Sequence, residues 1–218
     1  GRLRQPSTLG VLTPPSHYGA DIACGDIQGL GLHMNYGGGV AGFIATADDP
    51  RFVDEYPSRL FGIAPTSEKE WGFGDVLWER TSFANRDSAK EFVGTHSALW
   101  GIAAGVYLAA MGPQGMKEIG EAVVQRQLCL KKVLSGVKGL SFDRLSGTPF
   151  QEVVADFSAS GKKVSEINKK LLEKGILGGY DLGRNFPELE GCMLLAVTEQ
   201  TSADDIKALA SALSEILA

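Results

Sequence analysis

Apolar positions in the second half of the chain recur with the period of an α-helix. From residue 114 to residue 133 they fall three or four apart, which predicts an amphipathic helix that ends at a capping glycine, Gly136. A second helix is predicted over residues 164–174, with Ser165 in its first turn. Short apolar runs separate the helices and predict strands at residues 140–142, 150–157 and 193–198.

The chain ends in a further helical pattern that begins at Ser202. The Ser202 hydroxyl can cap this helix, and Asp204 and Asp205 suit the positive end of its dipole. The apolar face of the helix consists of Ile206, Leu209, Ala210, Leu213, Ile216 and Leu217. The second half of the chain therefore predicts a compact α+β unit.

The first half of the chain has fewer helical periods and more strands and loops. Strands are predicted at residues 8–12, 19–24 and 40–46. Residues 48–92 predict a loop-rich section that is dense in aromatic and charged side chains. An apolar helix follows over residues 96–111 and stops at Gly112-Pro113.

The change of pattern near Gly112 predicts two domains, residues 1–112 and residues 113–218. A chain of 218 residues that is 44% hydrophobic and 22% charged can bury a sizeable core. Because the chain begins with Gly1, in what reads as a mid-protein loop, we expect it to be a fragment or a processed product of a longer protein.

Charge and cysteine content exclude several classes of function. With a net charge of −5 and an isoelectric point of about 5.3, the chain lacks the excess of basic residues that binds nucleic acid or an anionic membrane. The longest apolar run, residues 98–111, is too short to span a bilayer. Three cysteines without CxxC spacing argue against zinc and for reduced thiols, which predicts a cytoplasmic protein.

Candidate catalytic side chains are scattered rather than grouped in a known motif. His17, His33 and His96 lack metal-ligand spacing and are interpreted as structural, with His33 the first to test because it neighbours a glycine run. That run, residues 37–39, could cradle an anion, but it lacks the lysine of a P-loop. A tight connection between two strands is the favoured interpretation.

A Schiff-base enzyme needs a buried lysine, and the sequence offers no clear candidate. Lysines of the second half fall on polar helix faces or in turns, where a solvated ammonium group is usual. Lys69 and Lys90 lie in the loop-rich section, and neither follows a strand. The residues alone therefore do not establish an enzyme.

Residues 175–184, GILGGYDLGR, are the most specific segment of the chain. Glycines that permit positive φ and close approach to another surface are Gly175, Gly178, Gly179 and Gly183. Polar chemistry comes from Tyr180, Asp181 and Arg184. The segment resembles one in subunit 1 of the two-subunit glycine decarboxylase, the P-protein family of the glycine cleavage system.

Further segments resemble the same family over nearly the whole chain. They are GADIACGDIQGLGLHMNYGGGVAGFIAT (19–46), PSRLFG (57–62), GPQGMKEIGE (112–121) and VTEQTSADDI (197–206). Residues 79–100 depart from the basic stretch that the family often has before its apolar helix.

The resemblance implies an α/β fold of the fold-type I PLP-dependent enzymes. Residues 1–112 would hold the last strands of the large domain, and residues 113–218 would form the small C-terminal α+β domain. Counting from Asp21 puts Gly29 at the position where the catalytic subunit carries its cofactor lysine. The resemblance therefore implies that this chain has no catalytic residue and that the partner subunit binds most of the pyridoxal phosphate (PLP).

The resemblance also implies a function and a site. With a lysine-bearing subunit 2, glycine dehydrogenase (aminomethyl-transferring) decarboxylates glycine on PLP and passes the aminomethyl group to the lipoyl group of the H-protein. This chain is expected to support that chemistry and to be inactive alone. A loop with Tyr36, Gly37 and Gly38 is the candidate contact to the phosphate of partner-bound PLP.

Two alternatives remain open. One is another fold-type I PLP enzyme, such as a cysteine desulfurase or an aminotransferase, although the missing lysine after a strand argues against it. The other is a non-catalytic interaction module whose aromatic residues Trp71, Phe73 and Trp78 bind a partner.

Overall fold

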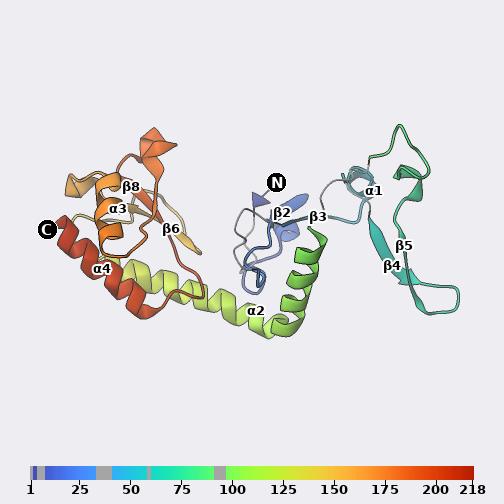
Figure 1. Ribbon diagram of the computed structural model, residues 1–218, viewed down its shortest axis with the longest axis horizontal. Helices are drawn as coiled ribbons and strands as arrows, with labels where there is room; N and C mark the ends of the chain where they lie inside the picture. The colour runs from blue at the N-terminus through green and yellow to red at the C-terminus, as the bar shows by residue number, and fades with distance from the viewer. Residues whose placement is uncertain (1, 4–7, 33–40, 58–59, 91–96) are drawn as a thin grey trace. The chain divides into compact units, whose positions relative to one another are not determined.

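The computed structural model describes residues 2–3, 8–32, 41–57, 60–90 and 97–218 (Figure 1). The chain divides into two compact units, the first unit (Gly1–Gly112) and the second unit (Pro113–Ala218). Within the described ranges, every helix lacks either the length or the apolar content that a membrane crossing requires.

The second unit is built on a three-stranded antiparallel sheet. Its strands are β6 (Glu152–Asp156), β7 (Tyr180–Asp181) and β8 (Cys192–Ala196), in the order β6-β8-β7. Leu194 in the central strand pairs with Val154 on one side and with Tyr180 on the other. The strand predicted at residues 140–142 is reduced to one isolated bridge, between Ser141 and Asp156.

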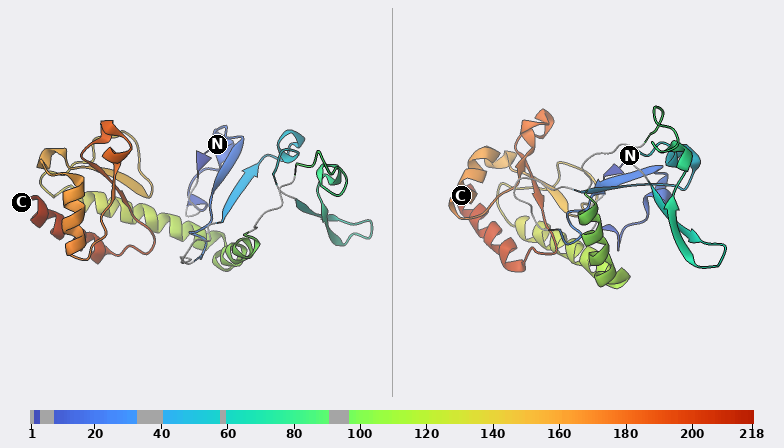
Figure 2. Two further views of the ribbon diagram at one scale, coloured as in Figure 1. Left: turned by 45° about the horizontal axis from the view of Figure 1, so that its top comes forward. Right: turned by 45° about the vertical axis from the view of Figure 1, so that its right-hand side comes forward.

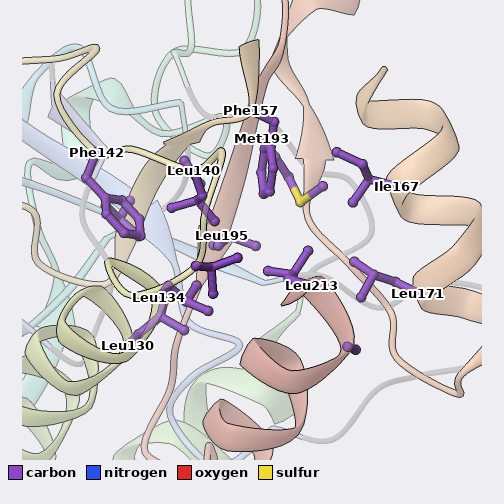
Figure 3. Close-up of a cluster of buried hydrophobic side chains, with 14 of the residues drawn as sticks. Leu130, Leu134, Leu140, Phe142, Phe157, Ile167, Leu171, Met193, Leu195 and Leu213 are labelled. Atoms are coloured by element: carbon purple, nitrogen blue, oxygen red, sulfur yellow. The ribbon is translucent and has the colours of Figure 1, made fainter. Parts of the chain in front are cut away.

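Helices α2 (Ala98–Leu134), α3 (Val164–Glu173) and α4 (Ala203–Leu217) supply apolar side chains to the core of the second unit. Figure 3 shows side chains from these helices and from the sheet directed toward one another. The fully buried members include Leu134, Phe157, Ile167, Leu171, Met193 and Leu213. The apolar residues that recur at helical spacing in the sequence therefore form part of one continuous buried cluster.

Helix α4 begins at the residue that the sequence predicts. Ser202 Oγ accepts a hydrogen bond from the Asp205 N–H at 3.1 Å, and the Asp205 carboxylate accepts one from the Ser202 N–H at 2.8 Å. These bonds form a capping box, which satisfies backbone donors at the helix start. The Asp205 carboxylate also accepts a hydrogen bond from the Ser202 hydroxyl at 2.7 Å, and this bond, together with the one from the Ser202 N–H, lowers the pKa of Asp205.

Gly112 interrupts the long helix α2. Its φ of 62° and ψ of −178° are not helical, and Pro113 follows without a backbone N–H to donate. The predicted stop at this dipeptide is confirmed as a kink between two helical segments. Helix α2 ends at Leu134, and the N–H of Gly136, the predicted cap, donates to the Val133 carbonyl at 3.3 Å. Gly136 does not have positive φ; the next glycine that does is Gly139, where the chain passes Ser160.

The first unit contains a three-stranded sheet. Strands β1 (Arg2–Leu3), β2 (Ile22–Asp26) and β3 (Gly42–Thr46) lie in that order, with β1 parallel and β3 antiparallel to β2. The strand predicted at residues 8–12 is wrong. The carbonyl of Thr8 accepts hydrogen bonds from the N–H groups of Val11 and Leu12, so the backbone turns there.

The section predicted to be loop-rich contains a β-hairpin. Strands β4 (Phe61–Pro65) and β5 (Trp71–Asp75) pair antiparallel, and both views in Figure 2 show them as a two-stranded ribbon. The short helix α1 (Pro50–Val53) precedes it. Single 3₁₀ turns occur at η2 (Pro15–Tyr18), η3 (Trp78–Arg80), η4 (Ser158–Ser160), η5 (Leu182–Arg184) and η6 (Pro187–Leu189).

Candidate functional site

The turn after β2 is closed by its own hydrogen bonds. Gln28 N–H donates to Asp26 Oδ1 at 3.0 Å, and Gln28 Nε2 donates to the Leu32 carbonyl at 2.8 Å. Leu30 N–H donates to the Ile27 carbonyl at 2.9 Å. Ile27, Leu30 and Leu32 are buried, so the turn is packed as well as hydrogen-bonded.

Two glycines in this turn limit its chemistry. Gly29 lies in the middle of the turn and is exposed. Gly31 has a φ of 75°, and a Cβ there would lie 2.6 Å from Cδ2 of Tyr107. The position that the family resemblance assigns to a cofactor lysine therefore has no side chain.

The predicted cofactor contacts Tyr36, Gly37 and Gly38 lie outside the described residues, as do His33 and His96. His17 is exposed in the 3₁₀ turn η2. Within the described ranges, no three side chains of His, Cys, Asp or Glu are grouped closely enough to hold a metal ion.

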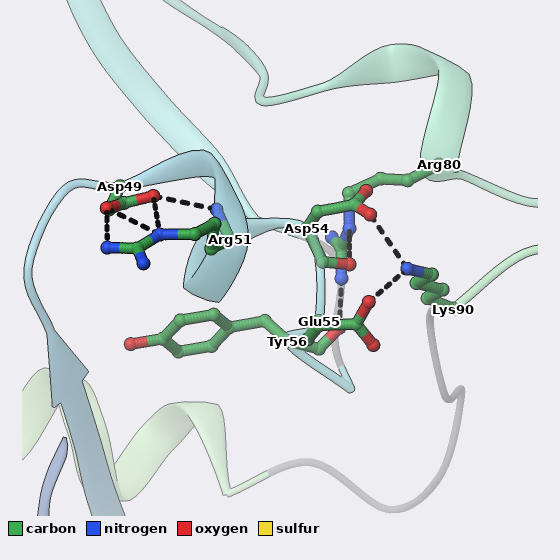
Figure 4. A network of polar contacts seen from close by, with 7 residues as sticks. All are labelled: Asp49, Arg51, Asp54, Glu55, Tyr56, Arg80 and Lys90. Carbon is green, nitrogen blue, oxygen red and sulfur yellow. Dashed lines mark hydrogen bonds and ion pairs between the residues drawn. The ribbon is translucent and has the colours of Figure 1, made fainter. Parts of the chain in front are cut away.

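Both lysines of the first unit are unsuited to covalent catalysis. Lys69 lies in the loop of the hairpin, with a φ of 64°. Lys90 forms ion pairs with Asp54, at 2.7 Å, and with Glu55 (Figure 4). The hydrogen bonds from these two carboxylates raise the pKa of Lys90. A raised pKa keeps the amine protonated, whereas a nucleophilic lysine needs a lowered pKa.

Arg80 joins segments of the first unit that are far apart in the sequence. It is 4% exposed, and its guanidinium donates to the backbone carbonyls of Asp54, at 3.2 Å, and Tyr56 (Figure 4). Reasoning from the sequence missed this role, because nothing in the pattern of residues 48–92 marks one arginine as buried. Arg80 and Lys90 together hold the turn at residues 54–56 in place, which is a structural task.

The glycine segment at residues 175–184 passes close to the sheet and to α3. A Cβ at Gly178 would lie 2.0 Å from Asn168 Oδ1, and one at Gly179 would lie 2.2 Å from the Leu194 carbonyl oxygen. Asn168 Nδ2 donates to the Gly179 carbonyl at 2.8 Å. The predicted close approach is confirmed. Of the four glycines that permit positive φ, Gly175, with 73°, is the one that adopts it.

Comparisons with known proteins agree with this arrangement of elements. The model of the family "Glycine cleavage system P-protein" matches residues 4–213. The chain belongs to this family.

Two curated relatives show how much of the family's length the chain covers. It is 38% identical over 212 residues to "Probable glycine dehydrogenase (decarboxylating) subunit 1" of Pyrococcus furiosus, covering 97% of this chain and 46% of the relative. The protein of the same name from Anoxybacillus flavithermus is 39% identical over 210 residues, with 96% and 45% covered. The chain thus spans about half the length of the curated relatives that it matches.

Solved structures support the fold. A crystal structure of glycine decarboxylase (P-protein) of the glycine cleavage system, in inhibitor-bound form, matches with a TM-score of 0.83 and 34% identity, over 98% of this chain and 47% of that chain. A NifS-like protein from Rickettsia africae matches with a TM-score of 0.58 at 14% identity, which concerns the fold alone. The predicted α/β class of the fold-type I PLP-dependent enzymes is confirmed.

Proposed function

We propose that this chain acts as part of subunit 1 of glycine decarboxylase and supports a reaction that a lysine-bearing subunit 2 performs. The observation that carries the proposal is Gly29 in the closed turn after β2, where the family resemblance places the cofactor lysine. The sequence has no lysine before Lys69. The relatives are named as subunit 1 of glycine dehydrogenase (decarboxylating), and such a name implies a second subunit.

Covalent attachment of PLP does not fit either lysine of the first unit. PLP, held by the partner, supplies an electron sink for the loss of CO2 from glycine. Lys90 is held in its charged form by two carboxylates, and Lys69 lies in an exposed hairpin loop. The role that we propose for this chain is to shape the partner's active site and its docking surface.

The proposed contact between this chain and the cofactor is the loop with Tyr36, Gly37 and Gly38. Successive backbone N–H groups of a glycine-rich loop suit a phosphate group. The test is the PLP affinity of the assembled complex, measured with Tyr36→Phe and Gly38→Ala. We expect weaker PLP binding in both variants, and unchanged affinity would refute the contact.

The proposed reaction partners are subunit 2 and the lipoylated H-protein, and the proposed location is the cytoplasm. The three cysteines are free, as expected for a reducing compartment. The activity test is PLP-dependent exchange of the glycine carboxyl with bicarbonate, by this chain alone, by subunit 2 alone and by their mixture. Exchange in the mixture only is the expected result. Exchange by this chain alone would contradict the proposal.

A second candidate function, a non-catalytic interaction module, is favoured by the hairpin. Ile63 pairs with Phe73 and Pro65 pairs with Trp71, so these four side chains lie on one face of the two strands. Trp71 is 70% exposed and Phe73 is 81% exposed. The other face carries only small residues, which are Gly62, Ala64, Gly72 and Gly74.

An isolated hairpin with an exposed apolar face is only marginally stable and favours a contact with another surface. A double variant, Trp71→Ser with Phe73→Ser, should lower both binding to subunit 2 and binding of an apolar fluorescent dye. Leu177→Ser is the matched control, because Leu177 is also highly exposed, at 89%, but lies in the second unit. If binding to subunit 2 survives the double variant, the hairpin would contact a different partner.

A further inference from the structure

A cleft of about 700 Å³ lies wholly within the second unit. One wall is the stretch from Ser158 to Ser165, which leads from β6 into α3. The other wall is formed by residues 181–191, the continuation of the glycine segment. A volume in this range is typical of sites for small molecules.

The two walls are held together by fixed contacts. Phe157 N–H donates to the Gly191 carbonyl at 2.9 Å, and Ser158 Oγ donates to the Glu190 carbonyl at 3.5 Å. Gly191 has a φ of 81°, and a Cβ there would lie 2.5 Å from Ser158 Oγ. The cleft is therefore part of the folded second unit rather than a gap between loosely placed segments.

Charged side chains of both signs line this cleft without pairing with one another. Within the described part of the chain, Lys163, Arg184, Asp181 and Glu190 make no ion pair. Lys162 is different, because its ammonium group donates to the Ile216 carbonyl near the end of α4. Two cations and two carboxylates therefore remain available to a ligand.

The position of the lysines is unfavourable for the fold by itself. Lys162 and Lys163 directly precede α3, where the helix dipole favours acidic residues, and the side chain of Lys163 makes no capping hydrogen bond. Glu166 is the acidic residue of the first turn. In contrast, α4 begins with Ser202 and two aspartates, as stability requires. An anionic group in the cleft would offset the positive charge at the start of α3.

We propose that this cleft binds the zwitterion of a small α-amino acid, with its carboxylate at Lys163 and Arg184 and its ammonium group at Asp181 and Glu190. A simple anion would be repelled by the two carboxylates, and a simple cation by the lysine and the arginine. Only a ligand that carries both charges satisfies the whole lining. The volume of the cleft leaves room for a side chain on the α-carbon.

This site goes beyond the proposed function and does not depend on it. Ligand binding here requires neither PLP nor subunit 2, because every lining residue belongs to the second unit. A failed exchange assay would thus leave this inference standing, and a failed binding assay would leave the proposed function standing. The expected role is regulatory, as a response to the concentration of the amino acid.

The test is a titration of the full ¹⁵N-labelled chain with glycine, followed by amide chemical shifts. We expect saturable shifts at residues that line the cleft, with a dissociation constant on the order of millimolar, because exposed ion pairs are individually weak. Acetate and methylammonium, which each carry one of the two charges, should bind at least tenfold more weakly. Absence of saturable shifts, or equal binding of acetate, would overturn the proposal.

Variants identify the residues responsible for glycine binding. Arg184→Gln and Asp181→Asn should each weaken it at least fivefold. Lys163→Gln and Glu190→Gln are second choices if either fails to give a folded spectrum. Arg86→Gln is the control, because Arg86 is exposed in the first unit. Unchanged glycine affinity in a folded Arg184→Gln variant would overturn the site.

Discussion

The two units of this chain use their hydrophobic residues in opposite ways. In the second unit, side chains from three helices and the sheet form one buried cluster. In the first unit, many large apolar side chains lie exposed, among them Phe61, Ile63, Trp71, Phe73 and Phe83. The second unit therefore buries a large apolar cluster against itself, whereas the described part of the first unit leaves more of its large apolar side chains exposed.

Apolar residues thus have two different structural roles in this sequence. Apolar residues at helical spacing in the second unit specify a core, because each helix presents one apolar face to the same buried cluster. Apolar residues on the hairpin of the first unit specify a surface for contact. Substitutions of apolar residues should therefore have different effects in the two units.

The largest expected difference concerns burial. Leu213 is 0% exposed within the core of the second unit, so Leu213→Ala should lower the free energy of unfolding by about 2–5 kcal/mol. Leu172→Ala, at a position 64% exposed, should change it by less than about 0.5 kcal/mol. Chemical denaturation of both variants measures the contrast. Equal losses would mean that the cluster is not the core.

A smaller effect is expected where the glycine segment passes the sheet. Gly179→Ala should destabilise the chain by about 1–3 kcal/mol, because the new Cβ would lie 2.2 Å from the Leu194 carbonyl oxygen. Gly101→Ala is the opposite case, since Gly101 lies inside α2 with no heavy atom within 4 Å of the new Cβ. That change should stabilise the helix by about 0.5–1 kcal/mol. Thermal unfolding compares the two variants. Stability changes of the same sign in both would contradict the packing described.

Capping of α4 gives the next effect in size. Ser202→Ala removes the acceptor for the Asp205 N–H and should cost about 1 kcal/mol. Ser211→Ala, in the exposed middle of the same helix, should have almost no effect. Urea denaturation can resolve this difference, and an unaffected Ser202→Ala variant would exclude the capping box as a source of stability.

The smallest effect is a pH dependence from a buried thiol. Burial, with the nearby Asp156 carboxylate, raises the pKa of Cys192 above its unfolded value. Its contribution to stability is therefore complete below about pH 8.5 and is lost as the pH rises through the folded-state pKa. Stability measured from pH 7 to pH 10 should fall more steeply for the native chain than for Cys192→Ala. The same dependence of stability on pH in both proteins would refute the raised pKa of Cys192.

The sequence predicted the second unit better than the first for physical reasons. The start of α4 at Ser202 follows from a local cap, and the kink at Gly112 from a Gly-Pro dipeptide, so both could be predicted without tertiary information. The hairpin was missed because its strands alternate aromatic residues with glycine, which weakens the strand pattern. The turn at Thr8 was read as a strand because its apolar residues give no sign of the hydrogen bonds that bend it.

The candidate site shows the same limit. The glycine segment at residues 175–184 was found from its composition, but its polar partners were not. Asn168, which binds the Gly179 carbonyl, and Arg80, which binds two distant carbonyls, depend on contacts between segments far apart in the sequence. No local pattern predicts such contacts. The lack of a cofactor lysine is, in contrast, a prediction that needs only the sequence and its family resemblance, and it stays a prediction.

The central claim is that this chain supports a PLP reaction without carrying PLP covalently. Reduction with borohydride of an equimolar mixture of this chain, subunit 2 and PLP, followed by mass spectrometry of the peptides, tests it most directly. The account predicts stoichiometric labelling of one lysine in subunit 2 and no stoichiometric label in this chain. Stoichiometric PLP on Lys69, Lys90 or any other lysine of this chain would contradict it.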